Sequence, residues 1–410
     1  MNDSTLSNLV DQYVSGYSLP QPFYTDQGVF EKDWELIWSK NWLYAGTAAS
    51  IPKPGDYFVY EIKNESTIII RDNDMTIHAH YNTCTHRGSI ICSQAKGNTQ
   101  KLSCPYHNWV FDKDGSLFKA RLMPEEFDRS EYHLRPAHIA NVDGFIFICL
   151  AKTAPEVSTI KNDFGPFLKP FNIHSAKVAH SATYHLRTNW KLIGENFREC
   201  YHCGPVHPEY CSAVIGANMF ESAEPELAIK RPLWQSKGLE TETVDFKENT
   251  NHFAVRYPLR PGVKSYSTDG NTISIPMGDH QDHDAGVVGL VVYPNFWMDA
   301  VSDYMWTMRL TPIDASHTII DIEWLVDGKA VEGKDYTLDR LVQFWKITGE
   351  QDWILCENNF KGIESSRYKP GIYAPGEVDV KRYDDWYITT LRNSLNIQDR
   401  VAAALNDLFT

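Results

Sequence analysis

The chain has 410 residues, a hydrophobic content of 42% and a formal net charge of −14. This length favours two domains with sizeable cores, and the acidic balance argues against nucleic acid or an anionic membrane surface as a partner. Eight cysteines are too few for a disulfide framework in a chain of this length, so we expect core residues or metal ligands among them.

The first 41 residues open on a polar, acidic stretch that does not have the character of a signal peptide. No apolar run in the chain approaches the length of a membrane span, and we expect a cytoplasmic protein. Residues 30–38 carry apolar side chains at helical spacing behind Thr25 and Asp26, which are potential caps. Residues 1–41 are therefore predicted to form a helical segment that packs on the C-terminal domain.

From residue 42 the pattern changes to short strands separated by turn residues. Strand character is found at 56–62, 66–71, 75–80, 106–111, 116–118 and 144–150. The stretch Asp-Lys-Asp-Gly at 112–115 is a turn signal between two of these strands. We expect residues 42–152 to form a small all-β domain.

Two loops of this region each offer one thiolate and one imidazole. Cys84 and His86 stand in the first loop, and Cys104 and His107 follow after an interval of seventeen residues. Four such ligands on two hairpin tips predict a closed metal site. A zinc site usually keeps its two cysteines together and its two histidines together, whereas a Rieske [2Fe–2S] cluster uses two of each on separate irons. The mixed order favours the cluster over zinc and over four unrelated core residues.

Residues 153–410 mix helices and strands. Residues 152–164 are predicted to be a linker or surface segment, 189–201 and 335–362 to be helices, and 287–293, 304–312 and 318–325 to be antiparallel strands. The second domain is thus expected to be α+β, with an antiparallel sheet covered by helices.

The helix predicted over 189–201 leads into a second group of metal-binding side chains. Glu195, Glu199 and His202 have the spacing of one helical face. Gly204 and Pro205 are expected to break the helix, so that His207 turns back beside His202. Two imidazoles at a helix end suit iron, copper or zinc.

Other interpretations of this segment remain open from the residues alone. A single histidine at a helix end is most often a cap or a surface residue. Cys200 and Cys203 have half of a zinc motif, but no second Cys-x2-Cys completes it. We expect these two cysteines to pack the helix.

A third ligand for a two-histidine iron site should be a carboxylate from elsewhere in the fold. Asp352 lies on the apolar stripe of the helix predicted over 335–362, where an unpaired carboxylate is costly. Glu350 and Glu357 lie off that stripe. Asp352 is therefore the predicted ligand, and the alternative is a hydrogen-bonding hub between helices.

These segments resemble the Rieske non-haem iron oxygenases. The first matches Cys-x-His-(seventeen residues)-Cys-x2-His, with Arg87-Gly88 and Pro105-Tyr106 in place, and the second matches Asn-Trp-Lys, Glu-Asn and acid-x2-His-x4-His over 189–207. The resemblance implies that Cys84 and Cys104 bind one iron of a [2Fe–2S] cluster and that His86 and His107 bind the other.

The same resemblance implies that His202 and His207 bind a mononuclear Fe(II). It makes Glu199 a bridge for electrons rather than a ligand, at a position where many relatives carry Asp. The late carboxylate of the family precedes Gly-Ile/Leu-x-Ser and Pro-Gly, and residues 351–371 have that order, with Asp352 in the place of the ligand.

The resemblance covers nearly the whole chain and is closest to the glycine betaine demethylase (monooxygenase) type. It implies a helix-grip, START-like catalytic domain in 153–410, a separate NAD(P)H-dependent flavin/iron–sulfur reductase, O2 as co-substrate and a cyclic homotrimer. The small substrate is then a quaternary ammonium compound that loses an N-methyl group as formaldehyde.

Such a substrate needs aromatic side chains around its cation, and aromatic residues stand at 296, 297, 304 and 306, where core packing is the alternative. We expect the segment 220–284 to shape the pocket. Hydroxylation of an aromatic ring is the alternative function, and a non-catalytic Rieske electron carrier or a zinc protein is a remote one.

Overall fold

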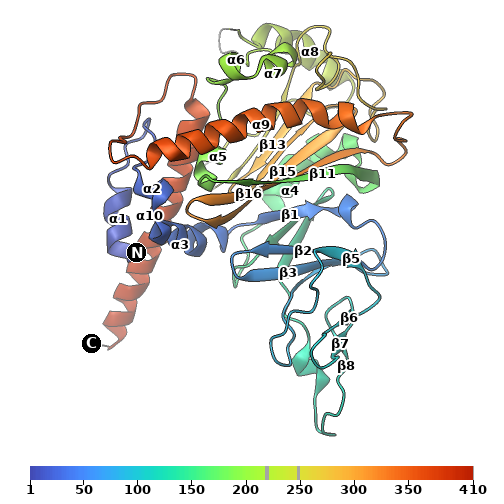
Figure 1. Ribbon diagram of the computed structural model, residues 1–410, viewed down its shortest axis with the longest axis vertical. Helices are drawn as coiled ribbons and strands as arrows, with labels where there is room; N and C mark the ends of the chain where they lie inside the picture. The colour runs from blue at the N-terminus through green and yellow to red at the C-terminus, as the bar shows by residue number, and fades with distance from the viewer. Residues whose placement is uncertain (218–220, 247–249, 410) are drawn as a thin grey trace.

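The structure is a computed structural model that describes residues 1–217, 221–246 and 250–409, with side chains described to residue 396. Figure 1 shows a large sheet crossed by one long helix, with a smaller β region at one end of the molecule. The predicted combination of an all-β region and an α+β region is confirmed. None of the described helices has the length and apolar character needed to cross a membrane.

The smaller region contains three antiparallel sheets. Their orders are β4-β3-β2-β5, β6-β7-β8 and β1-β10-β9. The strands are β1 (Leu43–Thr47), β2 (Asp56–Ile62), β3 (Glu65–Arg71), β4 (Ile77–Tyr81), β5 (Lys96–Asn98), β6 (Leu102–Ser103), β7 (Val110–Phe111), β8 (Leu117–Lys119), β9 (His138–Val142) and β10 (Phe145–Cys149). The strand predicted over 106–111 is reduced to its last two residues, because the preceding ones form a loop.

The larger region is built on a six-stranded antiparallel sheet in the order β11-β16-β15-β14-β13-β12. Its strands are β11 (Ala176–Leu186), β12 (His252–Tyr257), β13 (Val287–Val292), β14 (Phe296–Ala300), β15 (Met305–Asp314) and β16 (His317–Asp327). Helix α9 (Leu338–Ile363) runs across one face (Figure 1). The strands predicted over 287–293, 304–312 and 318–325 and the helix over 335–362 are confirmed, with ends shifted by a few residues.

Further helices surround this sheet. They are α1 (Asp3–Val10), α2 (Pro22–Thr25), α3 (Gln27–Asp33), the π-helical turn η1 (Trp34–Trp38), α4 (Ser158–Leu168), α5 (Trp190–Asn196), α6 (Cys203–Val206), α7 (Pro208–Ala213) and α8 (Glu224–Ser236), with α10 (Val378–Phe409) beside α1. The prediction of a linker over 152–164 is wrong in part, because α4 begins at Ser158 and buries Ile160 and Phe164 against the sheet.

A buried ion pair joins the N-terminal segment to the large region. Lys191 Nζ on α5 donates to Asp33 Oδ2 at 2.6 Å, and neither side chain is exposed. The Tyr387 hydroxyl on α10 donates to Asp33 Oδ1 at 2.6 Å. Loss of one member of such a pair typically costs ~3–5 kcal/mol of folding free energy. Three elements far apart in sequence are therefore held together directly ahead of the segment that carries Glu199 and His202.

Candidate active site

The loops after β4 and β6 share one backbone hydrogen-bond pattern. Cys84 N–H donates to the carbonyl five residues ahead at 2.9 Å, and Gly88 N–H returns to Cys84 O at 2.9 Å. Cys104 and Asn108 make the equivalent bonds at 2.8 and 3.0 Å. Gly88 and Asn108 both have positive φ, +77° and +58°, a conformation that favours these residue types. The two cysteines thus occupy equivalent positions in two loops that have the same backbone hydrogen bonds.

The four side chains of these loops meet between the two tips. The rings of His86 and His107 lie 4.6 Å apart, and both cysteines are buried. Burial, together with the neighbouring Cys104, raises the pKa of the Cys84 thiol to about 11. His86 Nδ1 is buried and has no hydrogen-bond partner in the described part of the chain. These groups fit a metal cluster, since a cationic centre stabilises thiolates and occupies a free ring nitrogen.

The segment that follows Asn189 differs from its predicted form. Helix α5 ends at Asn196, so the prediction of a helix to residue 201, with Glu195, Glu199 and His202 on one face, is wrong. The Glu199 carboxylate accepts the backbone N–H groups of Tyr201 and His202. Such a local side-chain bond competes with the helical pattern and favours a turn.

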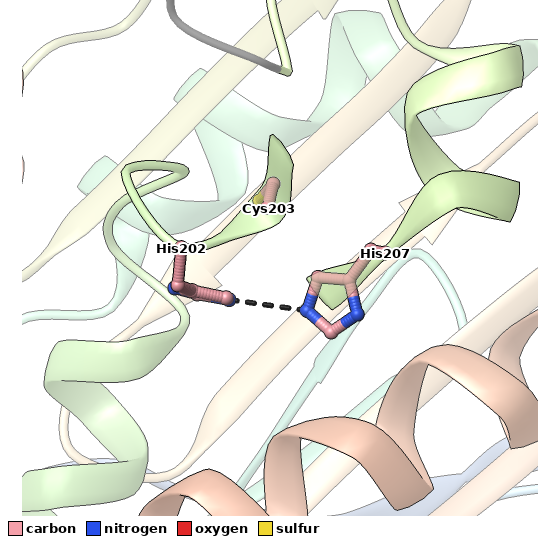
Figure 2. A group of neighbouring side chains, drawn as sticks. All are labelled: His202, Cys203 and His207. Carbon is pink, nitrogen blue, oxygen red and sulfur yellow. Dashed lines mark hydrogen bonds between the residues drawn. The ribbon is translucent and has the colours of Figure 1, made fainter. Parts of the chain in front are cut away.

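His202 and His207 nevertheless come together, from the two ends of the short helix α6. The expected helix break at Gly204 and Pro205 is also wrong, because both residues lie within α6. Figure 2 shows the two imidazoles pointing toward one another. The chain reverses through the turn before α6 and the change of direction between α6 and α7.

Asp352 on α9 completes this group. The distance between the Nε2 atoms of His202 and His207 is 3.1 Å, and Asp352 Oδ1 lies 3.2 Å from the first and 2.9 Å from the second. Ligands at right angles around a metal at ~2.1 Å lie ~3 Å apart. The three donor atoms therefore have the spacing of one face of a metal coordination sphere.

Two outer partners orient the histidines. His202 Nδ1 is 2.5 Å from Glu199 Oε1, and His207 Nδ1 is 2.7 Å from Gln351 Oε1. Bonds of this kind hold the hydrogen on Nδ1 and leave Nε2 free for a metal. The role of Gln351 was not predicted, and its position beside Asp352 was the only signal for it in the sequence.

The charges of this group favour a cation at its centre. Burial lowers the pKa of His202, but its contacts with Asp352 and Glu199 outweigh burial and raise it to about 9. Burial raises the pKa of Asp352, and its contacts with both histidines bring it below its ordinary value. Both shifts favour a proton on His202 beside an ionised Asp352. A divalent metal ion takes the place of that proton when the imidazoles become ligands.

Cys203 lies within the same cluster but is engaged elsewhere. Its Sγ and the ring nitrogens of His202 and His207 lie within 4.8 Å of one another. A disulfide joins Cys203 to Cys200, so the sulfur is not a thiolate ligand. The expectation that these cysteines pack a helix is replaced by a crosslink that closes a small loop around Tyr201 and His202.

A cavity opens directly on the three donor atoms. It offers about 200 Å³ and is walled by the segment after α5, by α9 and by strands β12 to β15. Its aromatic side chains are Phe197, Tyr210, Phe253, Tyr257, Trp297, Trp306 and Trp345. Pockets for drug-sized ligands measure ~300–1,000 Å³, so this cavity suits a smaller molecule.

The cavity tests the two expectations about pocket residues. Of the aromatic residues at 296, 297, 304 and 306, for which pocket and core were both open, Trp297 and Trp306 line the cavity, whereas Phe296 and Tyr304 are core residues. The segment 220–284, described except for residues 220 and 247–249, contributes the β12 side of the wall through Phe253 and Tyr257.

Residues 41–135 match the Rieske [2Fe-2S] domain, and residues 173–393 match the catalytic domain of the ring hydroxylating alpha subunit. The chain belongs to the Rieske oxygenase alpha-subunit family. Members are oxidoreductases of the mono- or dioxygenase type, and this chain has the domains for a Rieske [2Fe–2S] cluster and a mononuclear iron. It is the oxygenase component of a system that needs O2, a separate reductase and a small-molecule substrate.

This Rieske oxygenase subunit has relatives along nearly its whole length. The glycine betaine monooxygenase oxygenase subunit of Pseudomonas aeruginosa (strain UCBPP-PA14) is 35% identical over 388 residues, 92% of this chain and 90% of that protein. The quaternary ammonium Rieske monooxygenase CntA with γ-butyrobetaine has a TM-score of 0.69 at 21% identity, covering 95% of this chain and 99% of that one. Naphthalene 1,2-dioxygenase from Rhodococcus sp. has a TM-score of 0.68 at 18% identity, covering 95% and 98%. Both solved structures share the fold.

Proposed function

We propose that Cys84 and Cys104 bind one iron of the cluster, and that His86 and His107 bind the other. The support for this assignment is the matched pair of loops and the unpaired His86 Nδ1. When bound, the cluster supplies single electrons and the mononuclear iron supplies O2 activation.

We likewise propose that His202, His207 and Asp352 bind the mononuclear iron. The triangle of about 3 Å between their donor atoms supports this ligand set. Gln351 and Glu199 hold the two imidazoles in the required orientation from their Nδ1 side. The division of the chain at residues 41/42 and 152/153 is part of the same proposal.

The first test is elemental. Purified protein made under iron-replete conditions is expected to be red-brown, with about two inorganic sulfides and about three irons per chain. Cys104→Ser or His86→Cys is expected to bleach the Rieske spectrum, because each replaces one of the four proposed cluster ligands by a different donor. The matched control is Cys92→Ser, which changes a half-buried cysteine outside the two pairs. Colourless, zinc-filled protein from the same preparation contradicts the cluster assignment.

We propose that the reaction is oxidative N-demethylation of a small quaternary ammonium compound. The observation that carries this is the small, aromatic-lined cavity that opens on the His202, His207 and Asp352 triangle. Aromatic faces attract alkylammonium groups that have given up water. The activity for which the Pseudomonas relative is named, glycine betaine monooxygenation, is of this class.

The balance of this reaction is simple. The trimethylammonium substrate, O2, NAD(P)H and a proton give the dimethylammonium product, formaldehyde, water and NAD(P)+. One oxygen atom enters a carbon–hydrogen bond of the methyl group, and the carbon–nitrogen bond of the resulting hemiaminal then breaks. The cavity residues orient one methyl group toward the donor atoms of His202, His207 and Asp352, called the iron triangle below, and exclude bulk water. Ring hydroxylation is the second candidate, since naphthalene 1,2-dioxygenase has the same fold.

We propose a cyclic homotrimer in the cytoplasm, where NAD(P)H supplies the reductase. The loops around β6 and β7 lie at the end of the molecule remote from α6 and α7 (Figure 1). Electrons cannot readily pass between sites so placed within one chain. A head-to-tail ring brings the cluster of one subunit beside the iron of the next.

A substrate screen tests the reaction class. With its reductase, the protein is expected to consume O2 and release formaldehyde with glycine betaine, carnitine, choline or stachydrine. Formaldehyde equimolar with O2 consumed is the expected stoichiometry. Aromatic acids serve as the comparison series. If only an aromatic acid stimulates O2 uptake and ring-hydroxylated product forms, the second candidate replaces the first.

A further inference from the structure

The cavity wall carries two side chains of opposite charge that the metal sites do not use. Asp299 stands on β14, and Arg198 stands in the segment after α5. In the described structure, the ion pair of Arg198 is with Asp379, from Nη2 to Oδ2 at 3.8 Å, and not with Asp299. Arg198 and Asp299 thus do not neutralise one another across the cavity.

Asp299 lies on the sheet side of the cavity. Its cross-strand neighbours are Gly289 on β13 and Trp306 on β15. The carboxylate leans over Gly289, where an added Cβ would lie 3.0 Å from Asp299 Oδ1. Burial raises the pKa of Asp299 to about 7, while Tyr257 and Arg198 act to lower it. A carboxyl group in such a wall gains its charge most readily beside a cation.

Aromatic rings lead from Asp299 to the iron triangle. The ring of Trp306 lies 4.3 Å from that of Trp345 on α9. Tyr210 lies 6.0 Å from Trp345 and 6.5 Å from His207. An ammonium group over these rings gains cation–π attraction, and Tyr210 places one of the rings next to His207.

Arg198 forms another part of the wall. Its guanidinium carbon lies 5.2 Å from the ring centre of Phe253 and 5.6 Å from that of Phe246, and the side chain is 8% exposed. Nε is buried and has no hydrogen-bond partner among the residues that the structure describes. The 3.8 Å contact with Asp379 is too long for a good hydrogen bond. A carboxylate is the natural partner for the remaining donors.

Asp299 stands on one row of the sheet, and Arg198, which is not part of the sheet, packs over the neighbouring row. Asp299 belongs to the row through Gly289, whereas Phe253, which packs on Arg198, pairs with Val291 in the next row on the same face. Rows on one face of a sheet lie ~7 Å apart, which is two residue steps of ~3.3 Å. That offset suits a ligand with only a few bonds between its charged groups.

We propose that the cavity selects a small zwitterion, with Asp299 facing its quaternary ammonium group and Arg198 binding its carboxylate. This inference rests on the proposed function and narrows its substrates to short betaines. A cation without a carboxylate leaves Arg198 unmatched, and a carboxylate without an ammonium group leaves Asp299 unmatched. Each mismatch leaves a desolvated charge and lowers affinity.

Binding to the metal-loaded, oxidised protein tests this without turnover. Three ligands are titrated calorimetrically: trimethylglycine, its methyl ester, which lacks the negative charge, and 3,3-dimethylbutyrate, which lacks the positive charge. The wild type is expected to bind trimethylglycine at least about tenfold more tightly than either analogue, the scale of one hydrogen bond to a charged group. Equal affinity for all three overturns the proposal even if no variant folds.

Two variants then separate the roles. Arg198→Gln is expected to weaken the binding of trimethylglycine by about 10- to 100-fold and to leave the affinity for the methyl ester nearly unchanged. Asp299→Asn is expected to weaken the binding of trimethylglycine and of the methyl ester, but not the binding of 3,3-dimethylbutyrate. Arg340→Gln, which removes a surface guanidinium paired with Asp269, is the charge control and should change nothing. The Rieske spectrum of each variant reports its folding.

Results that contradict the zwitterion proposal differ from results that contradict the proposed function. If Arg198→Gln and Asp299→Asn weaken all three ligands equally, the two side chains only support the fold, and the zwitterion proposal is wrong. If the wild type releases no formaldehyde from any N-methyl compound but hydroxylates aromatic acids, the proposed function itself is wrong.

Discussion

Asp352→Ala is expected to abolish oxygenation while the Rieske spectrum stays intact. Asp352 Oδ1 lies 3.2 and 2.9 Å from the Nε2 atoms of His202 and His207, so its loss removes one of three donor atoms. The loss of an outer partner already costs ~10- to 100-fold in metal affinity or activity, and the loss of a direct ligand costs more. Iron per chain should fall from about three to about two, because the cluster keeps its own ligands.

Matched controls lie on the same helix. Glu350→Ala removes a half-exposed carboxylate 4.0 Å from Lys346 and should leave iron content and activity unchanged. Gln351→Ala removes the partner of His207 Nδ1 and should give an intermediate loss, since His207 remains a ligand in a less fixed orientation. Normal turnover by Asp352→Ala, with full iron, shows that the third ligand lies elsewhere.

The proposed metal ligands are the part of the candidate site that the sequence could predict. Cys84, His86, Cys104 and His107 form two short, ordered pairs, so local spacing alone indicates convergent loops. Asp352 could be proposed because a carboxylate on an apolar helical stripe needs a partner. The structure places it beside His202 and His207, which are far from it in sequence.

Other features depended on competition between local and tertiary contacts. The helix predicted over 189–201 has the right periodicity, but Glu199 bonds to nearby backbone N–H groups and the chain turns instead. No sequence pattern pointed to Asp299, because its place in the cavity wall depends on pairing with Gly289 and Trp306 on neighbouring strands. The pairing of strands brings such residues together, and no local pattern records it.

Glu199→Gln is expected to stop turnover without emptying either metal site. Glu199 Oε1 lies 2.5 Å from His202 Nδ1, and the side chain lines both the substrate cavity and a second cavity behind it. The glutamine amide oxygen can still accept the hydrogen of His202 Nδ1, so the orientation of that ring is kept. What is lost is the negative charge and its stronger, charge-assisted contact.

Within one chain Glu199 contacts His202 of the proposed iron site and the backbone of Tyr201. The loop after β6, which carries His107, lies at the opposite end of the molecule (Figure 1). In a head-to-tail trimer, a remaining lone pair of this carboxylate would accept a hydrogen bond from His107 of a neighbouring subunit and so join the two metal sites. Glu199→Asp, which keeps the charge but shortens the reach by one methylene, is the matched variant and should retain part of the activity.

Stopped-flow measurements decide whether Glu199 carries electrons between subunits. The reduced cluster of the wild type is mixed with O2 and substrate, and its reoxidation is followed by absorbance. In Glu199→Gln, iron and sulfide contents and cluster reduction by dithionite should equal those of the wild type, whereas reoxidation should slow in parallel with turnover. If Glu199 only caps the turn at Tyr201 and orients His202, its charge is not needed for electron transfer, and reoxidation stays fast in Glu199→Gln although glutamine keeps only one of the two acceptor oxygens. Fast reoxidation in Glu199→Gln therefore rules out the bridge. Turnover by protein that sediments as a monomer rules it out as well, because an electron path between subunits needs both the Glu199 carboxylate and the ring of subunits.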